Sequence, residues 1–116
     1  MNRVWQVRLV DQAERDLITI ADWTAKNFGS RQANHYLQTV SLALEALHDG
    51  PNPRGYRARS DIGPGICTLH VARQGRKGRH FVIFKEAEGH AIDVLRLLHD
   101  SMELARHIPL ANDQPD

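Results

Sequence analysis

The sequence contains a single cysteine, so no disulfide can form within the chain. Cys67 lies between Ile66 and Thr68 in an alternating apolar run, with no second cysteine nearby to complete a metal-binding or redox pair. We therefore interpret Cys67 as a small buried hydrophobic residue. At 116 residues the chain can bury a core without disulfides or metal. We expect one domain over residues 1–110 and a disordered tail over 111–116.

Long apolar runs are also missing. No segment approaches the roughly 18 to 20 apolar residues of a membrane span, and residues 1–16 contain no apolar stretch typical of a signal peptide. Hydrophobic residues make up 41% of the chain and charged residues 25%, close to the average for globular proteins. The composition predicts a cytoplasmic protein with a packed core and no membrane association.

The sequence lacks the signatures of metal and nucleotide chemistry. Its seven histidines show no HxH or HExxH spacing, and none is paired with a cysteine. There is no GxSxG motif, no GxxxxGK[ST] phosphate loop and no GxGxxG after a strand. We therefore expect no metal site and no cofactor.

Charge is unevenly distributed along a chain whose net charge is only +1. Residues 54–80 hold seven basic side chains and one acidic side chain, Asp61, which gives this segment a net charge of +6. Such a segment indicates a local surface for an acidic partner, either protein or nucleic acid. The alternative is that these are solvated loop charges, because Lys and Arg are mostly exposed in any protein.

Apolar periodicity predicts a strand followed by two helices. Residues Val4 to Val10 alternate as in a half-buried strand. Asp11 with Glu14 resembles a capping box and begins a helix that ends near Asn27. Ser30 is a candidate N-cap for a second helix that ends near His48. The connection between the helices is so short that they must form an antiparallel helical hairpin.

The second half of the chain predicts three strands. Residues 50–65 have no periodicity and are interpreted as a long loop, after which strands are expected over 66–72, 80–85 and 91–98. Short connections make these an antiparallel meander with HFVIFK in the middle. A helical turn capped by Ser101 is expected over 101–107. The fold class is therefore α+β, in the order β-α-α-β-β-β, with the hairpin on one face of a curved antiparallel sheet.

A metal-independent ribonuclease would need a base, an acid and cations for the developing phosphorane charge. The meander could supply these groups from Arg73, Arg79, Arg96 and His99, with Lys85 as a further cation. Each of these residues also has a structural interpretation as a strand-end or outward-facing charge. The pattern leaves catalysis open without indicating it.

The ordered set of residues resembles the RelE/ParE superfamily of bacterial toxins, and within it the ParE branch. The likeness runs from about Val7 to Ile108. It is carried by Ile20-Ala21-Asp22-Trp23 in the first helix, by Pro53-Arg54-Gly55, by HFVIFK and by Asp93-Val94-Leu95-Arg96-Leu97-Leu98-His99. Lys85 departs from the pattern, because a tyrosine is common at its position.

The resemblance implies the toxin of a type II toxin–antitoxin pair, in a hetero-oligomer with a ParD-like antitoxin that wraps the hairpin and the sheet. It implies no direct sequence-specific DNA binding. Apolar hairpin residues are the expected antitoxin contacts: Leu17, Ile20, Trp23, Tyr36, Leu37, Val40 and Leu44. Basic residues of the meander are the expected target contacts: Arg73, Arg76, Lys77, Arg79 and Arg96.

The two branches of the superfamily differ in activity. The resemblance to ParE implies inhibition of DNA gyrase by binding, without catalytic residues. In the RelE branch, ribosome-dependent mRNA cleavage uses basic residues and usually a C-terminal aromatic or imidazole group. Here the segment after His99 contains no tyrosine or phenylalanine and carries Asp100 and Glu103, which suit a phosphate site poorly. The sequence favours a ParE-like inhibitor; topoisomerase IV as the target, a ribonuclease and a member without toxicity remain alternatives.

Overall fold

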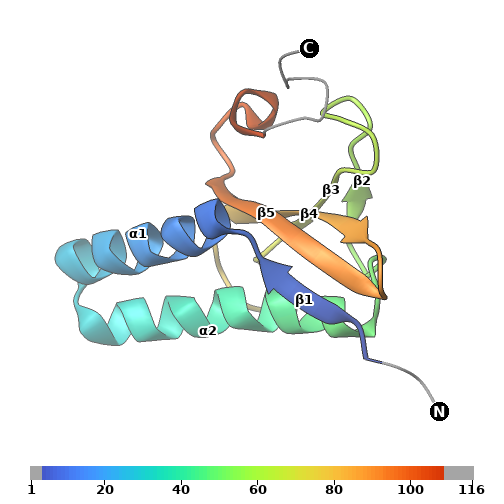
Figure 1. Ribbon diagram of the computed structural model, residues 1–116. Helices are drawn as coiled ribbons and strands as arrows, with labels where there is room; N and C mark the ends of the chain where they lie inside the picture. Colours follow the sequence, from blue (N-terminus) through green and yellow to red (C-terminus); the bar gives the residue numbers. More distant parts are fainter. Residues whose placement is uncertain (1–3, 109–116) are drawn as a thin grey trace.

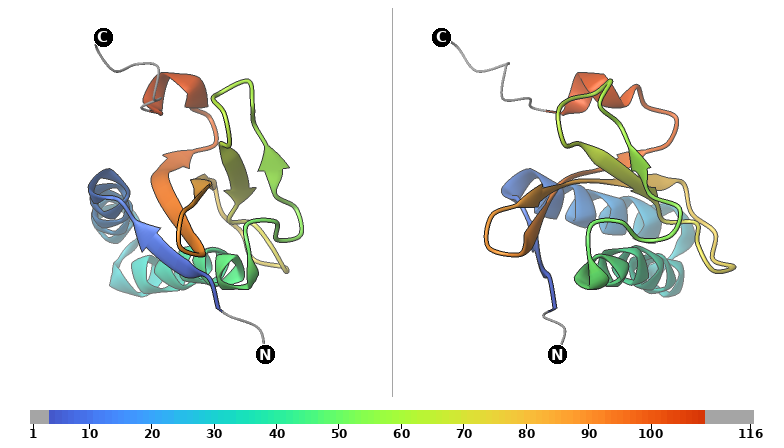
Figure 2. Two further views of the ribbon diagram at one scale, coloured as in Figure 1. Left: turned by 45° about the vertical axis from the view of Figure 1, so that its right-hand side comes forward. Right: turned by 90° about the vertical axis from the view of Figure 1, so that its right-hand side faces the viewer.

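A computed structural model describes residues 4–108. The predicted tail over 111–116 lies outside the described residues. The chain forms two layers, with both long helices on one face of a twisted sheet (Figures 1 and 2). The elements in chain order are β1 (Gln6–Leu9), α1 (Asp11–Phe28), α2 (Ser30–Ala46), η1 (Leu47–Asp49), β2 (Arg57–Ala58), β3 (Cys67–His70), β4 (His80–Ala87), β5 (Ala91–His99) and η2 (Leu104–His107).

The five strands are arranged in the order β1-β5-β4-β3-β2. The predicted meander of β3, β4 and β5 is confirmed, with β4 in the middle and a register shift between Ile83 and Phe84. The expectation of a wholly antiparallel sheet is wrong, because β1 pairs in parallel with β5. The loop predicted over residues 50–65 also contains a short strand, β2, which pairs with β3.

The helical hairpin is present, but its ends differ from those expected. Asp11 is the first residue of α1 and not its cap, because Val10 takes the N-cap position without a side-chain hydrogen bond. Gly29, at φ 91°, lies between the helices and is the N-cap of α2, so Ser30 is already helical. Ser101 does not cap η2 either, since Glu103 holds that position. Asp11 and Glu14 still favour α1 electrostatically, as anions in the first turn of a helix.

Hydrophobic side chains cover both faces of the sheet. Val82 and Phe84 of β4 face the helices and are fully buried in the main core with Val40 of α2. Ile83, between them, points to the opposite face and packs in a second cluster with Leu98 and Leu104. This second cluster is covered by the 59–66 loop and η2, which lie together beyond the sheet (Figure 2). The dense apolar character of β4 follows from burial on both faces.

A largely buried ion pair connects α1 to the last strand. Arg96 donates from Nε and Nη2 to the Asp16 carboxylate at 2.8 and 3.0 Å. The same carboxylate accepts the Leu97 backbone N–H at 2.9 Å. Arg96 also donates from Nη1 to the backbone carbonyl of His107, so one guanidinium joins α1, β5 and η2.

No helix within residues 4–108 is long and apolar enough to cross a membrane.

Candidate binding groove

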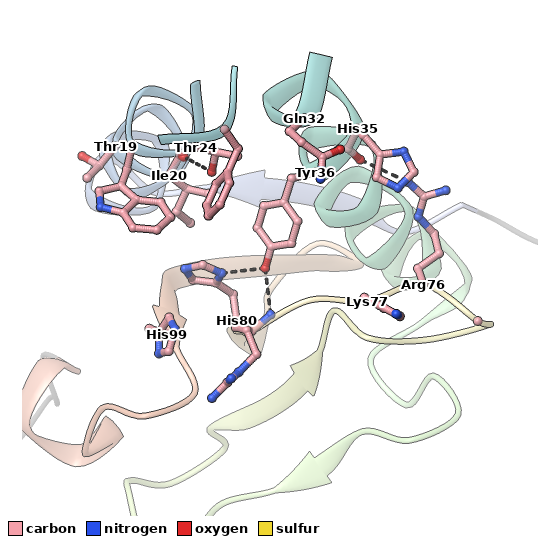
Figure 3. Close-up of a pocket in the computed structure, with 14 residues that line it drawn as sticks. Thr19, Ile20, Thr24, Gln32, His35, Tyr36, Arg76, Lys77, His80 and His99 are labelled. Atoms are coloured by element: carbon pink, nitrogen blue, oxygen red, sulfur yellow. Dashed lines mark hydrogen bonds between the residues drawn. The ribbon is translucent and has the colours of Figure 1, made fainter. Parts of the chain in front are cut away.

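An open groove of about 860 Å³ lies between the helical hairpin and the segment that joins β3 to β4 (Figure 3). Its helix side is mostly apolar and aromatic: Thr19, Ile20, Trp23, Thr24, Phe28, Gln32, His35 and Tyr36. Its other side is basic: Gly75, Arg76, Lys77, Arg79, His80 and His99. We call this feature the groove.

The Tyr36 hydroxyl joins the two sides of the groove. It accepts the backbone N–H of Arg79 at 3.0 Å and lies 2.7 Å from Nδ1 of His80 (Figure 3). Since the hydroxyl already accepts one hydrogen bond, its own proton is available for Nδ1. The neutral His80 ring then carries its proton on Nε2. The resulting bridge fixes α2 against the start of β4.

His80 is held in its neutral form. Burial lowers its pKa to about 4, with a further contribution from the nearby charge of His99. The two histidines are cross-strand partners in the β4–β5 register, and their rings meet edge to face at 5.3 Å. A protonated His80 ring would be poorly hydrated in this buried position, and positive charge on His99 would repel it. His80 therefore serves as an uncharged wall of the groove.

Replacing His80 by glutamine should make the free energy of unfolding depend less on pH below neutrality. In the wild-type protein, unfolded His80 takes up a proton as pH falls through its ordinary range near 6.5, whereas folded His80 does not until about pH 4. The free energy of unfolding therefore falls across this window, by about 1 to 2 kcal/mol after allowance for solvent screening. Glutamine keeps an acceptor for Tyr36 without titrating. Urea unfolding at about pH 7.5 and about pH 4.5 measures the difference; an identical loss in the variant contradicts the assignment.

Asp100 organises the polar end of the groove. Its carboxylate accepts from Arg79 at 3.1 Å and lies 2.9 Å from Nε2 of His70. Hydrogen bonds from Arg79 and His70 hold the pKa of Asp100 at about 2, below its usual range. Asp100 is therefore an anion that orients Arg79, while the Arg79 side chain stays 69% exposed.

Two further cations flank the groove. Arg76 donates from Nε to the Thr39 hydroxyl at 2.8 Å and from Nη2 to the His35 carbonyl at 3.1 Å, which ties the β3–β4 connection to α2. Lys77 is exposed, and within residues 4–108 its ammonium has no ion pair. The basic side of the groove thus combines two oriented guanidinium groups with one free ammonium.

Comparison with known proteins identifies the family. Residues 7–104 match the family described as the ParE toxin of type II toxin–antitoxin system, parDE. The chain belongs to the ParE toxin family. Toxin ParE1 of Mycobacterium tuberculosis is 31% identical over 96 residues, which cover 83% of this chain and 90% of that protein. Toxin ParE of Escherichia coli is 26% identical over 96 residues, or 83% and 85% of the two chains.

Solved structures confirm the α+β fold of this ParE-family toxin. A chain of the chromosomal ParDE system from P. aeruginosa superimposes with a TM-score of 0.67 at 22% identity, covering 84% of this chain and 98% of that chain. A chain of the RelBE2 toxin–antitoxin complex from Mycobacterium tuberculosis gives 0.53 at 20% identity, covering 83% and 98%.

The ParE-family toxin places the predicted basic residues in different environments. Arg76, Lys77, Arg79 and His99 all line the groove. Arg73 lies outside the groove and donates to the Arg54 carbonyl at 3.3 Å. Arg96 is also outside it, because its guanidinium is engaged by Asp16 beneath α1. The expectation that Arg96 points outward as part of one basic surface is therefore wrong.

The predicted apolar stripe of the hairpin faces mainly inward. Val40 is 1% exposed, and Leu17 and Leu44 are partly buried against the same core, so the sheet already covers this face. Leu37 is half-buried. Only Ile20, Trp23 and Tyr36 from the predicted set line the groove. The helical period shared by these residues therefore marks mainly the face that packs on the sheet.

Sequence reasoning missed several residues at the toxin's groove. Phe28 lies at the end of α1 and makes an edge contact with Trp23 at 5.7 Å, but it is outside the apolar stripe. His80 lines the groove and bonds to Tyr36, whereas Asp100 is not a lining residue and acts on the groove through Arg79. Among residues 4–108, no group of His, Cys, Asp and Glu is placed to hold a metal ion.

Proposed function

We propose that this toxin inhibits DNA gyrase by binding it, and that a cognate ParD-like antitoxin neutralises the toxin. The observation that carries the proposal is the match of residues 7–104 to the ParE toxin family. The relatives named as ParE toxins and the fold shared with the ParDE structure also support this proposal. The toxin is then held in the bacterial cytoplasm as an inactive hetero-oligomer with its antitoxin, and it acts on gyrase there once it is released.

The geometry of the groove supports a binding role. The guanidinium of Arg96 is already paired with Asp16. His80 has a pKa of about 4, so its ring is a poor proton donor near neutral pH. What remains accessible is an apolar wall beside three cations, which suits contact with a protein surface that carries carboxylates.

A supercoiling assay with purified gyrase tests the target. Folded toxin in excess should prevent conversion of relaxed plasmid to the supercoiled form, and toxin premixed with its antitoxin should leave the conversion intact. The premixed sample controls for contaminants in the preparation. Normal supercoiling at saturating free toxin would rule out gyrase as the target, and the same assay with topoisomerase IV tests the related alternative.

The second candidate is a ribosome-dependent ribonuclease of the RelE type, because Arg79 and His99 both line the groove. A catalytic role for these two side chains requires that Arg79→Ala and His99→Ala each relieve growth arrest and mRNA cleavage. Arrest that persists in both variants, at equal levels of soluble protein, would exclude this mechanism.

A further inference from the structure

The groove has the size and the lining of a site for a small molecule. Its volume of about 860 Å³ falls within the range of roughly 300 to 1,000 Å³ that is usual for ligand pockets. One side is mostly apolar and aromatic, and the cations of the groove all lie on the other side. A largely apolar lining with a few convergent polar groups is the usual composition of such a pocket.

The charges of the groove favour a ligand with one anionic end. Among the described residues that line the groove there is no aspartate or glutamate. Asp100 already compensates the charge of Arg79. Arg76 is held only by neutral oxygen atoms of α2, and Lys77 has no ion pair within residues 4–108. Uncompensated positive charge is therefore concentrated at Arg76 and Lys77, and a carboxylate is the complementary group.

The part of the groove beyond this charged end suits an apolar chain. Lys77 lies to one side of the contact between Tyr36 and His80, and Ile20 and His99 lie to the other side (Figure 3). The contact occupies the Tyr36 hydroxyl and Nδ1 of His80, and the His80 ring is neutral because its pKa is about 4. A ligand that begins at Lys77 therefore crosses an uncharged floor before it reaches Ile20.

The aromatic side chains favour an alkyl chain over a planar ring system. Trp23 and Phe28 line the groove and contact each other with their ring planes 63° apart. A planar base cannot lie parallel to both rings at once, so it cannot be sandwiched between them. A flexible alkyl chain can follow both ring surfaces. It would cover apolar area on two side chains that are 59% and 63% exposed.

We infer that the groove binds a monocarboxylate of the fatty acid type: the carboxylate lies at Lys77, and the alkyl chain runs along the groove to the Trp23–Phe28 pair. The binding is reversible and involves no covalent step. This inference goes beyond the proposed function and does not depend on it, because it requires neither an antitoxin nor gyrase.

Calorimetric titration of the full-length chain with four probes tests the class of ligand, at concentrations below those at which the probes form micelles. Decanoate should bind about fourfold more tightly than octanoate, because its longer chain covers more apolar area. 1-Octanol has the chain of octanoate without its charge and should bind about threefold more weakly than octanoate. Adenosine monophosphate carries a planar base and a phosphate, and it should bind more weakly than decanoate.

Two groove variants with matched controls locate the site. Lys77→Glu reverses the charge at the carboxylate end, and Lys85→Glu reverses an exposed lysine of β4 outside the groove. Phe28→Ala removes part of the aromatic wall, and Ile18→Ala removes another exposed apolar side chain of α1, also outside the groove. Thermal unfolding first establishes that each variant is folded. Each groove variant should weaken decanoate binding about fivefold or more, and each control should stay within about twofold.

The indole N–H signals of the two tryptophans provide a second readout by nuclear magnetic resonance. Trp23 lines the groove, whereas Trp5 is not a lining residue and stacks on His90 with ring centroids 3.9 Å apart. Decanoate should shift the indole signal of Trp23 and leave that of Trp5 in place. Trp23→Phe identifies the Trp23 signal by its loss.

Each result decides the inference. Saturable decanoate binding that depends on chain length, on Lys77 and on Phe28, with a shifted Trp23 signal, supports it. Absence of decanoate binding overturns it, as do 1-octanol binding as tightly as octanoate, equal losses in the control variants, or a shift confined to Trp5. Tighter binding of adenosine monophosphate than of decanoate also overturns it and indicates a nucleotide site. None of these results depends on gyrase inhibition, which the supercoiling assay decides separately.

Discussion

Replacing Asp16 by alanine should lower the free energy of unfolding by about 3 to 5 kcal/mol. The side chains of Asp16 and Arg96 are 11% and 19% exposed, so removal of the carboxylate leaves a largely buried guanidinium without its anion. It also leaves the Leu97 backbone N–H without its acceptor. The loss extends to η2, because Arg96 joins the His107 carbonyl to the sheet.

Urea unfolding measures this loss, and the Arg8–Asp93 pair provides the control. Arg8 and Asp93 are 46% and 24% exposed and make one 2.9 Å contact. Asp93→Ala should therefore cost no more than about 1 kcal/mol. Similar costs for the two substitutions would show that the Asp16–Arg96 pair is not the connection between α1 and β5 that the structure indicates.

Replacing Gly78 by alanine should cost about 1 to 3 kcal/mol through overpacking. An added Cβ would overlap Cγ2 of Val71 and would lie 3.1 Å from the Tyr36 hydroxyl. Val71 is 2% exposed and stiff because it is β-branched, so it cannot easily move away. The backbone at residue 78 must shift to relieve the overlap, and the added methyl group also presses on Tyr36, which disturbs its bridge to His80 and the wall of the groove.

Gly75→Ala is the matched control in the same connection. Gly75 has φ 81° with nothing within 4 Å of an added Cβ, so its substitution strains only the backbone, by about 1 kcal/mol. Both variants should unfold at lower urea concentration, but only Gly78→Ala should change the tyrosine environment seen by near-ultraviolet circular dichroism. An unchanged tyrosine signal in Gly78→Ala would contradict the close packing at this position.

Local periodicity was sufficient to predict the helical hairpin and the three strands of the meander. Ala13, Ile20 and Thr24 follow the helical repeat and are buried, and the apolar run of β4 corresponds to the middle strand. Such patterns are readable because each records which side of a single element faces the core.

Features that depend on distant residues could not be predicted in this way. The parallel pairing of β1 with β5 joins residues 85 positions apart, with no turn between them to define the register. β2 has only two residues, too few for a period to show. The cap expected at Ser30 was wrong because Gly29 lies at the N-cap in a backbone conformation that glycine tolerates.

The groove was predicted only in fragments. Arg79 and Trp23 were selected for charge and aromatic character, but nothing in the sequence shows that they line the same groove. Arg96 was misplaced because an arginine between Leu95 and Leu97 looks solvent-facing until its partner Asp16, on another element, is known. The apolar stripe was assigned to a partner because sequence alone does not tell which apolar face the protein itself covers.

The central claim is that this chain is a toxin whose toxicity is controlled by an antitoxin. Induced expression in a bacterial host, with viable counts followed over time, tests it most directly. The wild-type toxin should arrest growth when expressed alone, and co-expression of its cognate antitoxin should restore growth while both proteins copurify. Normal growth while soluble, folded toxin accumulates without its antitoxin would contradict the account.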